Sequence, residues 1–331
     1  MTNAITVWPP GGKPEAISLF VSGQNDSTET HQEGAPGTGR RAGAYPRNMR
    51  GMFLCFLAAA LAGGASGGAQ TTSQGSAAPL PNPSELLQRA IANEAKLAAE
   101  QERYECRVND ETTELDGKGK VKKTETEVKE QFYVNGVEVD RTLAKDGKDL
   151  NAEQTQKEDD RVMKKTLKYS DQATAQKETD KQTKEMQQML GAMMLTNGHR
   201  DQVDGRSALF YDIVPNPKYH AKNLNQRFAQ VMQGKISLDE QTGEPVDINI
   251  KSTQDLKIAG GVLASLHKGF WLHLHDHAEP DGVWLTDLAE GSGDARAMLF
   301  LHPYFRFKET TGGCHLYTAT AKQVGQAKVV K

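Results

Sequence analysis

The spacing of apolar residues changes along the chain, and the first clear period is helical. Ser84 and Glu85 follow a proline-containing polar stretch and suit the first turn of a helix, because both favour the free N–H groups there. The apolar residues that recur at helical spacing are Leu86, Leu87, Ala90, Ile91, Ala95 and Leu97. The pattern predicts an amphipathic helix that runs from Ser84 to about Arg103.

From Tyr104 to Leu150 the period becomes two, which is typical of strands. Thr, Val, Tyr and Phe are mixed with charged residues, so one face of these strands is polar. The hairpin signals between them are Asp116-Gly117, Asn135-Gly136 and Asp146-Gly147. We expect an antiparallel meander, because a parallel sheet would show continuous apolar runs.

A helix-forming segment, 151–195, interrupts the strands. Most of it is polar, and its apolar residues gather at the far end as Met186, Met189, Leu190, Met193, Met194 and Leu195. We expect a helical insertion whose apolar end covers the sheet. Methionine side chains adapt to irregular partners, so this end suits a variable apolar ligand, although ordinary core packing is the commoner explanation of such a pattern.

Strand patterns return after Asn197-Gly198. A hairpin between Phe228 and Ile250 and a strand that follows Gly269 place further apolar side chains on one face. The candidate ligand-binding residues are Met186, Met189, Met193, Met194, Phe228, Met232, Ile236, Val246, Ile248, Leu272 and Leu274. Meanders with inserted helices predict an α+β fold.

Residues 49–69 have the features of a signal peptide. A basic start precedes an apolar core from Met52 to Ala62, and small residues precede Gln70. The core is shorter than the roughly 20 apolar residues of a spanning helix, so export favours a soluble periplasmic protein over a membrane anchor. Residues 1–48 have no sustained apolar period, and we expect a disordered or untranslated extension upstream of Met49. A linker, 70–83, then leads to a single domain, 84–331.

The net charge of −3 gives no overall basic field, which argues against nucleic acid as a partner. After removal of the signal segment, Cys106 and Cys314 remain of the three cysteines. They could pair in an oxidising compartment or stay as inert thiols, and their spacing does not decide between the two.

After the signal segment, the sequence lacks a Gly-rich phosphate loop, a G-x-S-x-G elbow and an H-E-x-x-H motif, so no nucleophile or base can be nominated. We therefore expect a non-enzymatic protein without a cofactor. A rival signal is the row His273, His275 and His277, which shares one face of a strand and could hold a transition metal. The same alternation also describes histidines on a polar outer face, which is the simpler interpretation.

Several segments resemble the outer-membrane lipoprotein-sorting proteins, the LolA/LolB-like fold, and especially an uncharacterised exported bacterial group related to them. The segments are Tyr104 with LDGKGKVKKTETEVKEQFYVNG, then RTLAKDGKDLNAEQTQKEDDRV, GKISLDEQTGEPVDINI, and IAGGVLASLHKGF followed by DGVWL. The resemblance implies a strongly curved antiparallel sheet, a half-open β-barrel, with helices covering its concave apolar face. Members with assigned roles bind acyl chains or other hydrophobic envelope components there.

These observations lead us to expect a periplasmic carrier or binding protein for lipid or lipoprotein acyl chains. One alternative is a module of the same fold that senses the envelope through a membrane-protein partner. A second alternative is a metal-binding protein that uses the histidine row.

Overall fold

The computed structural model describes residues 4–6, 16–18, 79–258, 264–297 and 304–316 of the chain. Within 1–48, β1 (Ala4–Thr6) and β2 (Ala16–Ser18) pair as a separate antiparallel sheet. The rest of that stretch, the signal-like segment 49–69 and most of the linker 70–83 lie outside the described residues.

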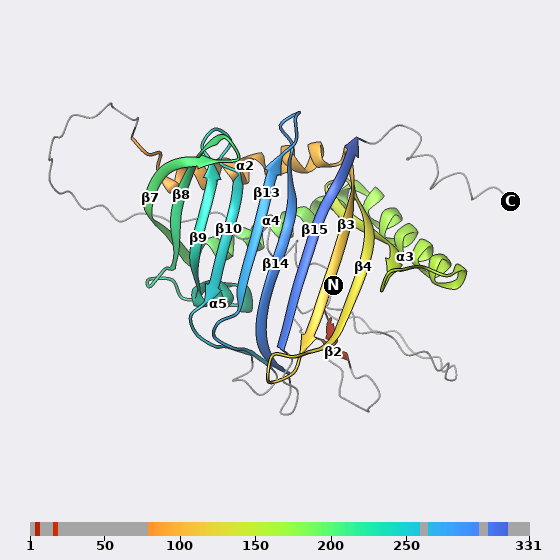
Figure 1. Ribbon diagram of the computed structural model, residues 1–331. Helices are drawn as coiled ribbons and strands as arrows, with labels where there is room; N and C mark the ends of the chain where they lie inside the picture. The colour runs from red at the N-terminus through yellow and green to blue at the C-terminus, as the bar shows by residue number, and fades with distance from the viewer. Residues whose placement is uncertain (1–3, 7–15, 19–78, 259–263, 298–303, 317–331) are drawn as a thin grey trace, which may run out of the picture.

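The body of the protein is a 13-stranded antiparallel sheet that curves without closing into a barrel (Figure 1). Its main order is β6-β5-β4-β3-β15-β14-β13-β10-β9-β8-β7, and β12, which pairs with β11, joins it at β14. The strands are β3 (Tyr104–Leu115), β4 (Val121–Val134), β5 (Val137–Lys145), β6 (Lys148–Asp149), β7 (Met193–Val203), β8 (Arg206–Pro215), β9 (Met232–Asp239), β10 (Pro245–Ser252), β11 (Leu256–Ile258), β12 (Ala264–Leu266), β13 (Trp271–Ala278), β14 (Trp284–Ala297) and β15 (Tyr304–Leu316). The α+β class and the half-open barrel are thereby confirmed.

Local turn chemistry explains the meander from β3 to β6. Asn135 and Gly136 have φ values of 47° and 76°, and Asp146 and Gly147 have values of 49° and 71°. These are the left-handed conformations that two-residue hairpin turns require. β3 also pairs with β15 along its length, so the two ends of the domain lie side by side in the middle of the sheet.

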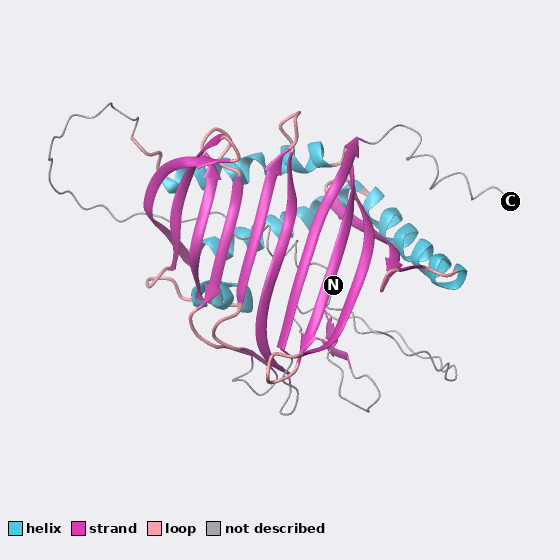
Figure 2. Cartoon of the chain, viewed as in Figure 1, coloured by secondary structure: helices cyan, strands magenta, loops and turns pink. Residues whose placement is uncertain are grey.

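The helices are α2 (Pro83–Gln101), α3 (Ala152–Ser170), α4 (Gln172–Gly191) and α5 (Leu224–Val231), and they lie on one side of the sheet (Figure 2). α2 confirms the first predicted helix. The α3 start is a capping box, in which Asn151 Oδ1 accepts the Gln154 N–H and Gln154 Oε1 accepts the Asn151 N–H. Asp171 separates α3 from α4 and caps α4 by accepting the Thr174 N–H.

The predicted helical insertion is too long at its C-terminal end. α4 ends at Gly191, and Met193, Met194 and Leu195 belong to β7 instead. Ala192 donates its N–H back to Met189, which closes the last helical turn. Met193 then lies opposite Pro215 in the ladder with β8, so a distant strand decides the conformation of residues that a helix would also accept.

The helix-covered face has an apolar part and a polar part. The apolar part lies over β8, β9, β10, β13 and β14, where one buried cluster joins the sheet to α4 and α5. On β4, however, Lys129 and Gln131 are buried, opposite Thr142 and Asp140 of β5. This part of the helix-covered face is therefore polar, and it is held to α3 through charges and hydrogen bonds.

Candidate functional site

Most of the predicted ligand-binding residues lie in a single buried cluster between α4, α5 and the sheet. Those in the cluster are Met186, Met189, Met193, Phe228, Met232, Ile236, Ile248, Leu272 and Leu274. Val246 is buried in β10 but lies outside this cluster, and Met194 is half-buried in β7. The structure thus brings together apolar side chains from segments almost 90 residues apart in sequence, between Met186 and Leu274.

Methionine dominates the contact between α4 and the sheet. Met186, Met189, Met193 and Met232 are at most 4% exposed, so their side chains fill the space between the layers. Unbranched thioether side chains change rotamer at lower cost than branched ones. This part of the core can therefore adjust its packing more readily than one built from valine and isoleucine.

Aromatic rings extend the cluster across β13, β14 and β15. Phe228 of α5 meets Phe270 edge-to-face at 6.0 Å between ring centroids, and Phe270 lies 6.3 Å from Phe305. β14 makes room for them with glycine, since a Cβ on Gly293 would lie 2.7 Å from the Phe270 ring. The periodicity of the sequence gave no sign of this packing because glycine carries no hydrophobic signal.

The C-terminal end of α4 is held in place by a polar clasp, which we define as the contacts of Asn216, Tyr219 and Asn223, between β8 and α5, with Gln188 and Gly191. Asn216 Nδ2 donates to the Gly191 carbonyl at 3.1 Å, and Tyr219 Oη donates to the Gln188 carbonyl at 3.2 Å. Asn223 Nδ2 donates to Gln188 Oε1 at 2.9 Å. The bonds from Asn216 and Tyr219 satisfy backbone carbonyls that the last helical turn leaves open. Sequence periodicity does not reveal these contacts, because they join residues more than 20 positions apart.

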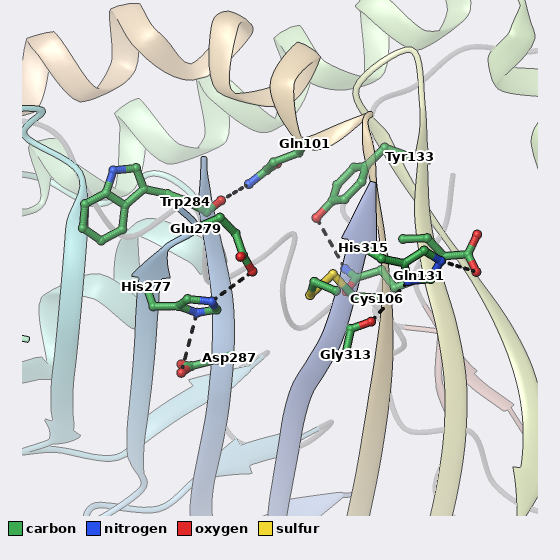
Figure 3. The surroundings of a disulfide bond; sticks show 12 residues. Gln101, Cys106, Gln131, Tyr133, His277, Glu279, Trp284, Asp287, Gly313 and His315 are labelled. Carbon is green, nitrogen blue, oxygen red and sulfur yellow. Dashed lines mark hydrogen bonds and ion pairs between the residues drawn. A yellow bond between two sulfur atoms is a disulfide. The ribbon is translucent and has the colours of Figure 1, made fainter. Parts of the chain in front are cut away.

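The three histidines of β13 lie beside carboxylates. His273 Nε2 is 2.7 Å from Asp247 Oδ2, and His275 Nδ1 is 2.7 Å from Asp287 Oδ1. His277 Nε2 lies 3.2 Å from Glu279 Oε1 (Figure 3). Leu272 and Leu274, between the histidines, belong to the buried cluster, so the alternation expected for an outer-face row is present.

Each histidine of the row lies within hydrogen-bonding distance of a carboxylate. Burial lowers the pKa of His275, but the hydrogen bond to Asp287 and the charges of Asp287 and Asp204 outweigh burial and raise it. Among the described residues, no three His, Cys, Asp or Glu side chains come together in an arrangement that could hold a metal ion.

Cys106 and Cys314 form a disulfide bond between β3 and β15 (Figure 3). It lies at a bulge, because the β15–β3 register shifts between Gly312 and His315. Cys106 packs in a small apolar cluster with Tyr104, Val283 and Leu285, against which Leu97 of α2 also packs. Of the two outcomes left open by the sequence, the structure shows the paired one.

Tyr104 anchors this cluster to the β13–β14 turn. Its hydroxyl donates to Asp281 Oδ1 at 2.8 Å, while Arg103 Nη2 lies 2.6 Å from Asp281 Oδ2. Burial, together with the hydrogen bond and charge of Asp281, raises the pKa of Tyr104 to about 12. The phenol thus stays protonated and keeps donating throughout the physiological pH range.

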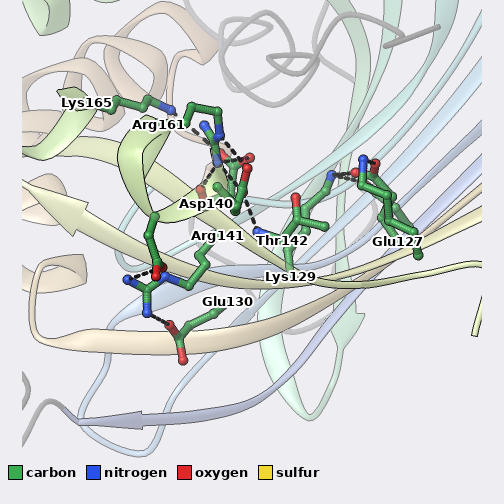
Figure 4. A network of polar contacts seen from close by, with 12 residues as sticks. Glu127, Lys129, Glu130, Asp140, Arg141, Thr142, Arg161 and Lys165 are labelled. Atoms are coloured by element: carbon green, nitrogen blue, oxygen red, sulfur yellow. Dashed lines mark hydrogen bonds and ion pairs between the residues drawn. The ribbon is translucent and has the colours of Figure 1, made fainter. Parts of the chain in front are cut away.

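A charged network lies between α3 and the polar part of the sheet (Figure 4). Glu158 Oε1 accepts the Thr142 backbone N–H at 2.6 Å, and Arg161 Nη2 donates to the Asp140 carbonyl. Lys165 Nζ lies 3.6 Å from Asp140 Oδ1. Two α3 side chains therefore satisfy backbone groups along the free side of β5. The sequence showed many charges here but could not show which of them meet.

Among the described residues, no helix is long and apolar enough to cross a membrane. No protein-family model and no curated protein matches the chain.

One solved structure that the comparison matched is described as an outer membrane lipoprotein-sorting protein domain from Vibrio parahaemolyticus. It is 10% identical, with a TM-score of 0.29, and the match covers 72% of this chain and 97% of that chain. A likeness of this degree supports no argument about function, so the fold class rests on the sheet topology and helix placement described above.

Proposed function

We propose that this protein is a periplasmic, non-enzymatic carrier that binds an acyl chain of a lipid or lipoprotein between α4, α5 and the sheet. The observation that carries the proposal is the methionine-rich contact formed by Met186, Met189, Met193 and Met232. Each methylene moved from water into such a cluster contributes about 0.8 kcal/mol before ordering costs are subtracted.

Export is supported by two independent features. Residues 49–69 have the composition of a signal peptide, and the Cys106–Cys314 disulfide is a bond typical of oxidising compartments. Together they favour the periplasm, where hydrophobic envelope components need carriers.

Binding requires the end of α4 to move away from the sheet. The clasp at Gln188 and Gly191 is made of neutral hydrogen bonds, each of which contributes only about 1 kcal/mol net. The acyl chain would take the place of contacts between methionines, and the apolar cluster would close over it again.

The first test is native mass spectrometry of the protein recovered from a bacterial periplasm without detergent, followed by extraction of bound molecules. We expect a discrete added mass that extracts as a lipid or lipopeptide. A bare mass, with no lipid recovered after exposure to envelope lipids, would contradict the carrier function.

A variant test separates ligand binding from core packing. Asp in place of Met189 and Met193 would bury two carboxylates and unfold the protein, because these residues are 1% and 3% exposed. We therefore use Met186→Leu, Met189→Leu and Met193→Leu together, since leucine nearly conserves volume. We expect the variant to fold but to retain several-fold less lipid. Val121→Leu, at a 53% exposed position of β4, should retain as much as the parent.

The tight packing of the same cluster favours a second candidate. If the core never opens, the protein is a module that senses the envelope through a protein partner. A lipid-free protein that captures the periplasmic domain of a membrane protein would favour this second candidate over the first.

A further inference from the structure

α3 carries two neighbouring apolar side chains on its exposed side. Met163 is 47% exposed and Leu167, one helical turn later, is 67% exposed. The opposite side of the same helix is anchored by Val162 and Tyr169, which are 4% and 5% exposed. Met163 and Leu167 therefore are not needed to attach α3 to the body of the protein.

Basic residues surround this apolar pair. From Arg161 to Ser170 the helix holds one arginine and three lysines and no acidic residue. Arg161 and Lys165 contact Asp140 on the sheet side. Lys164 is exposed next to Met163, and Lys168, which lies over the Tyr169 ring at 4.4 Å, follows Leu167.

The acidic residues that adjoin this segment in sequence, Asp160 and Asp171, have other partners. Asp160 Oδ1 accepts a hydrogen bond from Gln156 at 2.9 Å, and Asp171 caps α4. The exposed side of α3 is thus basic and apolar in its second half. α3 also lies beside the β4–β5 end of the sheet and extends past it, far from α5 (Figure 1).

We propose that the Met163–Leu167 side of α3 docks on the surface of a bilayer that contains anionic phospholipid. Apolar side chains that protrude from a helix between lysines enter the boundary of headgroups and acyl chains, while the ammonium groups stay near the phosphates. An acidic protein would complement the lysines equally well, but it would also need a pocket shaped for Met163 and Leu167, whereas a bilayer adapts to both.

This surface lies outside the proposed acyl-chain site, so the two proposals can fail separately. Docking on a bilayer would bring a carrier to the place where it loads or releases its chain. The docking itself is measured on vesicles and does not depend on what the protein carries.

The experiment is flotation of the full chain with vesicles of phosphatidylethanolamine and phosphatidylglycerol, compared with vesicles of phosphatidylcholine alone. We expect at least about fivefold stronger binding to the anionic vesicles, weakened by salt. Met163→Gln with Leu167→Gln should reduce that binding by about fivefold or more, and Lys164→Gln with Lys168→Gln should remove most of its salt dependence.

The control is Val121→Gln, which removes a 53% exposed apolar side chain elsewhere on the surface and should bind as the parent does. Circular dichroism and thermal melting should be the same for all variants, because every substituted side chain is at least partly exposed. Equal binding by the Met163/Leu167 variant and the parent would overturn the proposal. So would equal binding to both vesicle types, or capture by an immobilised acidic peptide with no binding to vesicles.

Discussion

At the scale of single residues, His275 stands out because it contacts two carboxylates from different elements. His275 lies 2.7 Å from Asp287 and 3.1 Å from Asp204, which belongs to the turn between β7 and β8. It therefore connects the tip of one hairpin to two neighbouring strands in the middle of the sheet. A neutral imidazole keeps part of this arrangement, but only the imidazolium donates from both ring nitrogens.

His275 gives a pH dependence with a definite sign. Its pKa is raised in the folded state, so its contribution to stability is fully present below the unfolded pKa of about 6.5 and is lost as the pH rises through the folded pKa. The urea concentration at the midpoint of unfolding should therefore decrease in the parent as the pH rises from 6 to 8. The decrease should be smaller in His275→Gln.

His220→Gln is the matched control, because His220 is exposed and lies between β8 and α5, away from the row. It should keep the parent's pH dependence. A slope for His275→Gln that equals the slope of the parent would show that the imidazolium has no stabilising role.

At the scale of elements, local signals predicted much of the fold. Asn135-Gly136 and Asp146-Gly147 fix their turns through their own φ preferences, and Asn151 starts α3 through contacts within four residues. Signals of this kind survive in any tertiary context. The end of α4 has no such signal, and Met193 joins β7 only because β8 lies beside it.

The same distinction applies to the candidate site. Local periodicity predicted several of its apolar residues, but not its polar contacts. Apolar alternation identified Ile248, Leu272 and Leu274, because a strand with one buried face has an apolar residue at every second position. The clasp of Asn216 and Tyr219 on α4, and the Glu158 contact with β5, depend on which elements meet in space. In the sequence alone, polar residues that make such contacts cannot be distinguished from polar residues that face solvent.

The contact between α3 and β5 is itself testable. Glu158 and Arg161 satisfy the Thr142 N–H and the Asp140 carbonyl at the free side of β5. Glu158→Ala with Arg161→Ala should destabilise the protein by about 2 kcal/mol and increase its tendency to aggregate, because a strand edge becomes open to other chains.

Urea unfolding and light scattering measure the two effects. The control is Glu153→Ala with Lys157→Ala. Like the first variant, it removes one acidic and one basic side chain from α3, but these side chains are 76% and 74% exposed. That variant should stay within about 0.5 kcal/mol of the parent. Equal effects of the two double variants would mean that the edge contact contributes nothing beyond a surface ion pair.

At the scale of the whole molecule, the chain returns to its starting strand. β15 pairs with β3, and the Cys106–Cys314 bond closes a loop with a sequence separation of 208 residues. The sheet edges at β6 and β7 stay apart, so the disulfide joins the middle of an open sheet. Its main effect is then on the unfolded chain, whose ends it keeps together.

Cys106→Ala with Cys314→Ala should therefore lower the free energy of unfolding by about 2–5 kcal/mol. The β3–β15 ladder remains hydrogen-bonded without the bridge, so we expect the variant to keep the fold and to unfold at lower urea. A reductant should lower the midpoint of the parent and leave that of the variant unchanged, which separates loss of the bridge from damage to the small cluster around Tyr104. If parent and variant unfold at the same urea concentration under oxidising conditions, the ladder alone holds the two ends of the domain together, and the bond adds no constraint to the unfolded chain.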